Sequence, residues 1–124
     1  MQDPPSTEKI EQPLYWPEPL LAFVQAEAHR IDRTFSWVVQ RAWKLTRDRI
    51  AALASAEQAK EHVGSLVEVA KRKQNLFFPA EMVGEMKREA ARLDRSTSWV
   101  VHLAVSLARP ELAKIPSAEE VDEA

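Results

Sequence analysis

The sequence lacks cysteine, holds only two glycines and has no long run of apolar residues. Without cysteine, disulfides, thiolate catalysis and cysteine-type zinc sites are excluded. Two glycines cannot form a glycine-rich phosphate loop. No apolar run approaches the ~20 residues of a membrane-spanning helix, and residues 1–7 lack the basic and apolar regions of a signal peptide. We therefore expect a cytoplasmic protein with no membrane partner.

What the sequence does contain is an internal repeat. Each residue from 12 to 53 aligns without a gap with the residue 62 positions later, and 16 of the 42 pairs are identical. The longest similar stretch is DRTFSWVV at 32–39 against DRSTSWVV at 94–101. Because neither copy of this 124-residue chain is large enough to bury a core alone, we expect one pseudo-twofold domain in which the halves complete each other.

Both copies have the same order of elements. Residues 73–78 alternate between polar and apolar and stop at Pro79, which predicts a short strand followed by a helix with proline in its first turn. Apolar residues at helical spacing predict that this first helix is amphipathic in both copies. They are Leu20, Val24, Ala28 and Ile31 in repeat 1, and Met82, Met86, Ala90 and Leu93 in repeat 2.

A turn and a second helix follow. Asp94 tolerates a left-handed conformation, and Ser96, like Thr34 in repeat 1, can cap the next helix. We expect this second helix at about 35–53 and 97–109, buried against its twin, with Pro110 kinking it or ending it early. By strand parity Trp16 is expected in the core, and the core is also the favoured place for Trp37 and Trp99.

Residues 54–70 join the two repeats. Ser55 and Gln58 have the spacing of a capping box, and an apolar stripe behind them predicts a linker helix. The second helix of repeat 2 is more apolar than its twin, and this strip is expected to receive the linker helix or another chain. The expected divisions are a disordered arm at 1–10, repeat 1 at 11–53, the linker at 54–70, repeat 2 at 71–116 and an acidic disordered tail at 117–124.

Strand, helix and helix, twice over, resembles the ribbon-helix-helix superfamily, the fold of Arc- and MetJ-type repressors. The most specific string is KRKQNLFFPAEMVGEMKREAARLDRSTSWVV at 71–101. The resemblance implies a mostly α, tandem single-chain fold, in which two short antiparallel strands form one ribbon beside four main helices and a helical linker. It also implies a bacterial nucleoid or transcription-control protein whose ribbon enters the major groove of double-stranded DNA.

Carried over to this chain, the resemblance places Lys73, Asn75 and Phe77 on the outward ribbon face, with Glu11, Pro13 and Tyr15 from repeat 1. Lys73 can reach guanine or phosphate, and Asn75 can pair with adenine. The starts of both second helices offer phosphate sites. The alternative to phosphate binding at these helix starts is that the hydroxyls of Thr34 and Ser96 only cap the helices, and that Arg33 and Arg95 only pair with nearby carboxylates. The candidate DNA-binding or nucleotide-binding residues are Tyr15, Arg33, Thr34, Lys71, Arg72, Lys73, Asn75, Phe77, Arg95, Ser96 and Ser98.

Repeat 1 departs from a typical DNA-reading strand. The chain has a net charge of −2, and although residues 71–75 contribute +3, Glu11 would repel phosphate. Pro13 removes one ladder donor, which is tolerable only if its nitrogen faces away from the partner strand. Three outcomes follow: an asymmetric DNA reader that relies on repeat 2, a protein that binds itself or another ribbon-helix-helix chain, or a ribbon with a different ligand.

For the third outcome, the KRKQ, FFP and LDRS strings look like a small subgroup of ribbon-helix-helix nucleoid proteins that bind cyclic di-GMP in competition with DNA. That resemblance implies cations for the phosphates, from Lys71, Arg72 and Lys73, and stacking of a guanine on Phe77. A further class is an antitoxin-like interaction module that uses the second helix or the acidic tail.

Catalysis is not expected. The three histidines fall in different elements without metal-ligand spacing, so neither a metal site nor a resident cofactor is expected.

Overall fold

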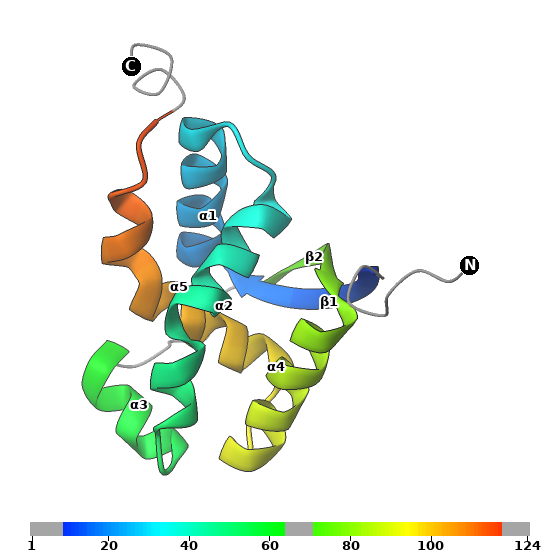
Figure 1. Ribbon diagram of the computed structural model, residues 1–124, viewed down its shortest axis with the longest axis vertical. Coiled ribbons are helices and arrows are strands. Elements are labelled where there is room, and N and C mark those ends of the chain that lie inside the picture. Colours follow the sequence, from blue (N-terminus) through cyan, green and yellow to red (C-terminus); the bar gives the residue numbers. More distant parts are fainter. Residues whose placement is uncertain (1–8, 64–70, 118–124) are drawn as a thin grey trace.

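The computed structural model describes residues 9–63 and 71–117, with backbone only at 60–63 and 71. Within these residues the chain is mostly helical and has one two-stranded antiparallel sheet, which confirms the expected mostly α class (Figure 1). The elements follow one another as β1 (Lys9–Pro17), α1 (Glu18–Ile31), α2 (Phe35–Ala51), α3 (Ala56–Val63), β2 (Lys71–Pro79), α4 (Ala80–Leu93) and α5 (Thr97–Ala113).

β1 and β2 form one ribbon, which lies between α1 and α4 in Figure 1. Its register places Pro13 opposite Asn75, two residues that the 62-residue repeat makes equivalent. The pseudo-twofold axis that relates the two strands therefore passes between Pro13 and Asn75. Lys9 and Ile10, which we had assigned to the disordered arm, are the first two residues of β1, and the residues before them lie outside the described part.

The ribbon has one buried and one exposed face. Leu14, Trp16, Leu76 and Phe78 are at most 2% exposed and face the helices. Because side chains alternate along a strand, their neighbours point the other way. The burial pattern confirms the predicted face assignment in both strands, including the core position of Trp16.

α1 and α4 each start directly after a strand-ending proline. Pro17 and Pro79 occupy the position before the helix rather than its first turn. Both helices end at an aspartate with φ of 57°, Asp32 and Asp94, as predicted for the left-handed turn. This turn redirects the chain into α2 or α5 within three residues.

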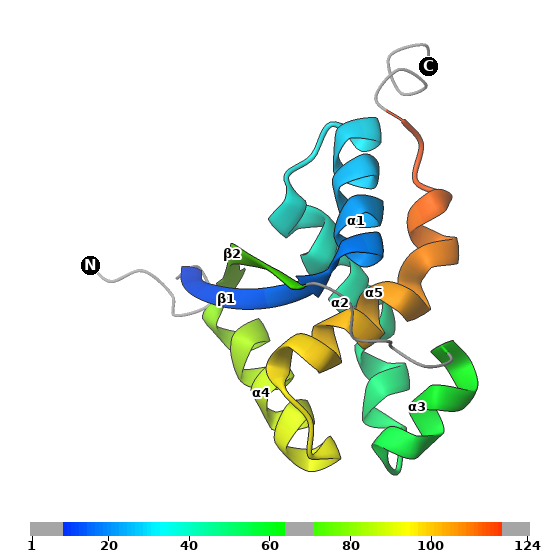
Figure 2. The same ribbon diagram turned by 180° about the vertical axis from the view of Figure 1, so that it is seen from behind.

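α2 and α5 pack against each other at the centre of the molecule, as expected for the second helices. α5 continues through Pro110 to Ala113, so the expected early end is wrong. Proline in a helix removes one hydrogen bond, but Leu112 is buried beyond it and Arg30 donates to the final carbonyls. Figure 2 shows the orange end of α5 turned away from the direction of its yellow start, as a proline kink predicts.

The linker begins with α3, which packs against α5. Ala59 of α3 is fully buried, and so are Leu103 and Val105 of α5, so the predicted apolar strip is covered. The helix expected over residues 64–70 and the disorder expected for residues 118–124 fall outside the described residues. Trp37 and Trp99 are half-buried at the edge of the core rather than inside it.

Candidate functional site

The outer ribbon face consists of the outward side chains of both strands, all of which are exposed. Tyr15 is 48% exposed and Phe77 50% exposed, which is unusual for large aromatic side chains. The face is therefore free to contact a partner. Its members, in cross-strand pairs, are Tyr15 with Lys73, Pro13 with Asn75, and Glu11 with Phe77.

Charge divides this face into two ends. Lys73 makes one end basic, whereas Glu11, its repeat equivalent, makes the other end acidic. Arg72 does not add to the basic end, because its side chain pairs with Glu18 at 2.9 Å. The two halves of the face therefore differ in chemistry although their backbones are equivalent.

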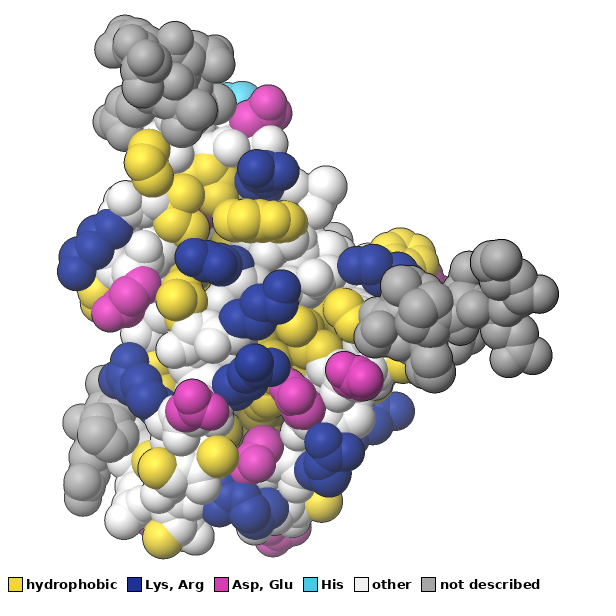
Figure 3. Space-filling model, in the orientation of Figure 1, with side chains coloured by type: hydrophobic (Ala, Val, Ile, Leu, Met, Phe, Trp, Pro, Cys, Tyr) yellow, Lys and Arg dark blue, Asp and Glu magenta, His cyan; other side chains and the backbone are white. Residues whose placement is uncertain are grey.

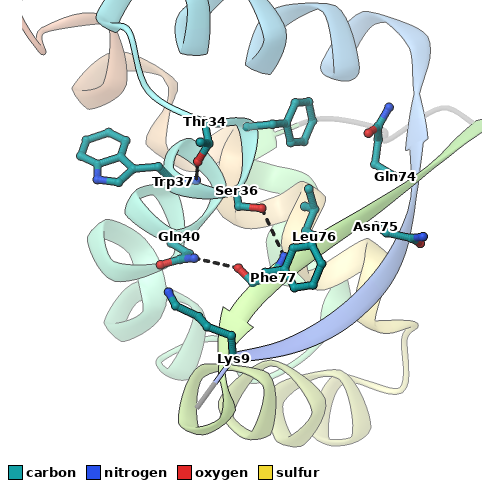
Figure 4. Close-up of a pocket in the computed structure, with 10 residues that line it drawn as sticks. Lys9, Thr34, Ser36, Trp37, Gln40, Gln74, Asn75, Leu76 and Phe77 are labelled. Carbon is teal, nitrogen blue, oxygen red and sulfur yellow. Dashed lines mark hydrogen bonds between the residues drawn. The ribbon is translucent and has the colours of Figure 1, made fainter. Parts of the chain in front are cut away.

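The β2 edge is held by the first turns of α2. The Phe77 N–H donates to Ser36 Oγ at 3.2 Å, and Gln40 Nε2 donates to the Phe77 carbonyl at 2.8 Å (Figure 4). These bonds satisfy backbone groups that face away from β1. They also fix the start of α2 beside the outer ribbon face.

The β1 edge is held by α5 in the same way. The Tyr15 N–H donates to Ser98 Oγ at 3.1 Å, and His102 Nε2 lies 2.5 Å from the Tyr15 carbonyl. Since a carbonyl oxygen only accepts, His102 Nε2 is the donor here. Ser98, which we had counted among the ligand-binding candidates, thus positions the ribbon.

These contacts explain how the ribbon tolerates Pro13. Residues two apart in a strand direct their backbone groups to the same side. Because the Tyr15 N–H points away from β2, the nitrogen of Pro13 does so as well. The hydrogen-bond ladder between β1 and β2 therefore loses no donor, and the nitrogen of Pro13 faces away from the partner strand, as expected from the sequence.

Each helix start beside the ribbon carries a hydroxyl cap and an arginine. Thr34 Oγ1 accepts from the Trp37 N–H at 3.0 Å, and Ser96 Oγ accepts from the Trp99 N–H at 3.1 Å. The predicted capping roles are therefore confirmed. These hydroxyl bonds leave other N–H groups of the first turn without a helical partner, as in any helix.

The arginines stack on tryptophan instead of pairing with acids. The Arg33 guanidinium lies 5.1 Å from the Trp37 ring centroid, and the Arg95 guanidinium 5.7 Å from the Trp99 centroid. Within the described part of the chain, neither side chain forms an ion pair. Arg95 also donates to the Asp94 carbonyl at 3.1 Å. The remaining N–H groups of both guanidinium groups can donate to an anion.

A cavity of about 580 Å³ lies between the β2 edge and the start of α2 (Figure 4). Ser36 and Gln40 line it from α2, the capping residue Thr34 from just before that helix, Phe77 from β2 and Lys9 from β1. Lys9 and Gln40 were missed as site residues. The repeat offers a signal for Lys9, because continuing the alignment three residues toward the N-terminus pairs it with Lys71.

Most of the sequence-predicted residues come together. Tyr15, Lys73, Asn75 and Phe77 form the outer ribbon face. Arg33 with Thr34, and Arg95 with Ser96, stand at the starts of α2 and α5, which are fixed to the two ribbon edges. The backbone of Lys71 lies opposite Pro17 at the end of the ribbon, and its side chain is outside the described part.

The described residues contain no group of three histidine, aspartate or glutamate side chains arranged to hold a metal ion. No helix in the described part of the chain combines the length and apolar character needed to cross a membrane. No protein-family model, curated protein or solved structure gives a significant match to the chain.

Proposed function

We propose that this chain is a tandem ribbon-helix-helix protein that binds double-stranded DNA, as a transcriptional regulator or a nucleoid-associated protein. The observation that carries the proposal is the exposed ribbon face with a helix start fixed to each edge by Ser36 and Ser98. The strand-helix-helix order in both halves and the register centred on Pro13 and Asn75 also support it.

The ribbon supplies the base contacts. A two-stranded ribbon fits the major groove, and its outward side chains project toward base edges. Lys73 and Asn75, two residues apart on one strand, are exposed on this face. Lysine donates to guanine O6 and N7, and asparagine pairs with adenine N6 and N7. We assign base reading mainly to repeat 2.

The helix starts supply the phosphate contacts. The N-termini of α2 and α5 carry free N–H groups and the positive end of the helix dipole. Arg33 and Arg95 add an exposed guanidinium at each start. With one such site beside each ribbon edge, the protein would grip the two backbone strands that border the groove.

Salt dependence tests this proposal. We expect labelled duplex DNA to bind in fluorescence anisotropy and to lose affinity steeply with salt, because binding to phosphate releases counterions. Lys73→Ala should weaken binding and flatten the salt dependence by about one charge. The matched control is Lys114→Ala, an exposed lysine at the far end of α5. Absence of binding at low salt, or equal effects of both variants, would overturn the proposal.

A second candidate function is binding of cyclic di-GMP, as the resemblance implies. The exposure of the Tyr15 and Phe77 rings favours it, because guanines stack on flat rings, and Lys73, opposite Tyr15, offers the cation that a phosphate needs. Calorimetry with cyclic di-GMP should give heat that Phe77→Ala abolishes. Heat that survives Phe77→Ala, or no heat at micromolar protein, contradicts this candidate and leaves DNA binding to its own test.

A further inference from the structure

One face of α2 is exposed where the equivalent face of α5 is buried. Leu45 of α2 is 37% exposed and Arg41 is also exposed, whereas their repeat equivalents Leu107 and Leu103 are 8% and 0% exposed. α3 packs on α5 and has no repeat counterpart among the described residues. α3 thus packs on α5, while the Arg41 and Leu45 positions of α2 are exposed.

This open α2 face, made of Arg41, Lys44 and Leu45, is basic. In the described part of the chain, the side chains of Arg41 and Lys44 have no hydrogen bond or ion pair. Figure 3 shows blue side chains gathered over α2, with yellow atoms between them. The face therefore suits an acidic segment with an apolar contact point.

The chain itself contains such a segment at the matching place in the repeat. Residues 55–62 read SAEQAKEH and residues 117–124 read SAEEVDEA, which is again an offset of 62 with four identical residues in eight. Residues 56–63 form α3. The tail at 117–124 is therefore the sequence counterpart of α3.

The chain also leaves α2 and α5 in the same way. The residue after α2, Ala52, has φ −79° and ψ −12°, and its counterpart Lys114 has φ −82° and ψ −13°. The carbonyls of the next residues, Leu53 and Ile115, each accept a hydrogen bond from an arginine of the other half. The two exits are thus equivalent up to the points where α3 and the tail begin.

Where the two copies differ, the differences are complementary in charge. α5 has Leu103 and Ser106 where α2 has Arg41 and Lys44. The segment that follows α2 has neutral Gln58, and at the equivalent place the tail has Glu120. Residues 117–124 carry a charge of −4. The acidic tail, the counterpart of α3, is therefore complementary in charge to the basic face of α2, the counterpart of α5.

We propose that residues 117–124 dock on the open α2 face, as α3 docks on α5. Val121, the counterpart of buried Ala59, meets Leu45, and the tail carboxylates lie beside Arg41 and Lys44. An eight-residue helix is marginal in water, so the packing and the charge pairs hold it in place. Once docked, the acidic tail covers the basic side chains of the open α2 face, and its carboxylates repel polyanions from this face. The proposal is independent of the DNA-binding role.

A spin label tests the docking, because the chain has no cysteine and Ala124→Cys gives one labelling site. In ¹⁵N-labelled full-length protein, we expect loss of amide signal intensity at Arg41, Lys44 and Leu45, and much weaker loss at Leu103, Ser106 and Leu107. High salt should restore the signals, because screening weakens exposed charge pairs. Equal loss on both helices, or no loss on α2, overturns the proposal.

Charge reversal provides the matched control. Arg41→Glu with Lys44→Glu should remove the effect, and adding Glu120→Lys with Asp122→Lys should restore it. Because Arg41 and Lys44 are exposed, circular dichroism should show an unchanged fold. An effect that survives the reversal overturns the proposal.

A mixing experiment tests a second copy of the chain as the occupant. Spin-labelled chains without ¹⁵N are mixed with ¹⁵N-labelled chains that carry no spin label. Loss of signal intensity in this mixture alone would assign the open α2 face to a dimer contact instead.

Discussion

Arg30 and Arg92, 62 residues apart, make the same connection from opposite halves of the molecule. Each lies in the last turn of the first helix of its repeat and donates to carbonyls at the end of the other repeat's second helix. Each arginine supplies a donor to one carbonyl just beyond the helix, and a second donor to the Ile50 or Leu112 carbonyl, which also accepts a backbone N–H of the closing turn. The contacts are Arg92 to Leu53 and Ile50 at 2.5 and 2.9 Å, and Arg30 to Ile115 and Leu112 at 2.7 and 3.1 Å.

Removing one of these connections should weaken the whole fold. We expect Arg92→Ala to lower the free energy of unfolding by about 1–3 kcal/mol, because two carbonyls lose a charged donor. Arg92→Lys should recover only part of this, since an ammonium lacks the planar fork that reaches both carbonyls and Glu89. Urea unfolding followed by circular dichroism measures both changes.

The control for this prediction lies on the same helix. Arg88 is an exposed arginine of α4, and Arg88→Ala should change the unfolding free energy by no more than about 0.5 kcal/mol. If Arg92→Ala is as mild as Arg88→Ala, the connection does not contribute to stability.

The arginine connections also show where sequence reasoning ends. Alternation and local residue chemistry were sufficient for the strand at 73–78, the turn at Asp94 and the caps at Thr34 and Ser96, because these features depend on residues close in the chain. The outward face of the ribbon came from the resemblance. The repeat places Arg30 and Arg92 at equivalent positions. It does not indicate that each reaches a carbonyl more than 35 residues away, since backbone acceptors leave no mark in a sequence.

Proline and histidine illustrate the same limit at the candidate site. From local chemistry Pro110 predicts a kink or an early helix end, whereas α5 continues to Ala113 and Leu112, beyond the proline, is buried. His102 has no histidine at the equivalent position, where Gln40 stands. Both side chains nevertheless contact a ribbon carbonyl, Tyr15 or Phe77. His102 and Gln40 thus both bind a ribbon carbonyl although they are different residues, so a search for identical residues in the two repeats does not find this equivalence.

Trp43 and Glu85 form a hydrogen bond, and the equivalent place in the other half of the molecule has a different contact. Trp43 Nε1 donates to Glu85 Oε1 at 2.7 Å, and Trp43 is 1% exposed. At the equivalent places stand Val105 and Phe23, and Arg109 lies 4.5 Å from the Phe23 ring centroid. We expect Glu85→Ala to lower the unfolding free energy by about 1–3 kcal/mol, because a buried indole N–H loses its acceptor.

A conservative variant separates the hydrogen bond from the charge of Glu85. Glu85→Gln keeps an oxygen acceptor and should retain most of the stability, although it loses the 3.5 Å ion pair with Arg47. Thermal unfolding monitored by tryptophan fluorescence compares the variants. Equal losses for alanine and glutamine would show that the ion pair, rather than the indole bond, matters.

Trp16 should tolerate replacement by the residue of its repeat equivalent, Phe78. Its side chain is fully buried, and its Nε1 has no hydrogen-bond partner among the described residues. Trp16→Phe removes this unsatisfied donor while leaving a smaller ring, so the two effects oppose each other. We expect a change of less than about 1 kcal/mol in the unfolding free energy, against about 3–5 kcal/mol lost for Trp16→Ala. A loss for phenylalanine close to that for alanine would contradict this.

Glu11 is the residue that most sets the acidic end of the outer ribbon face apart from the basic end. Its repeat equivalent is Lys73, and both stand opposite an aromatic residue of the other strand. Glu11→Lys therefore gives the ribbon a lysine at each end. If the face binds DNA, we expect about tenfold tighter binding at low salt and a salt dependence steeper by about one phosphate contact. Fluorescence anisotropy with labelled duplex measures both quantities.

The same change in net charge can be made away from the ribbon. Glu111 is exposed near the end of α5, and Glu111→Lys adds the same two units of charge. Local potential governs contact with a polyanion, because charges beyond a Debye length of ~10 Å are largely screened. Glu111→Lys should therefore change affinity far less than Glu11→Lys. Equal gains from both would mean that overall charge, and not the outer ribbon face, determines binding to DNA.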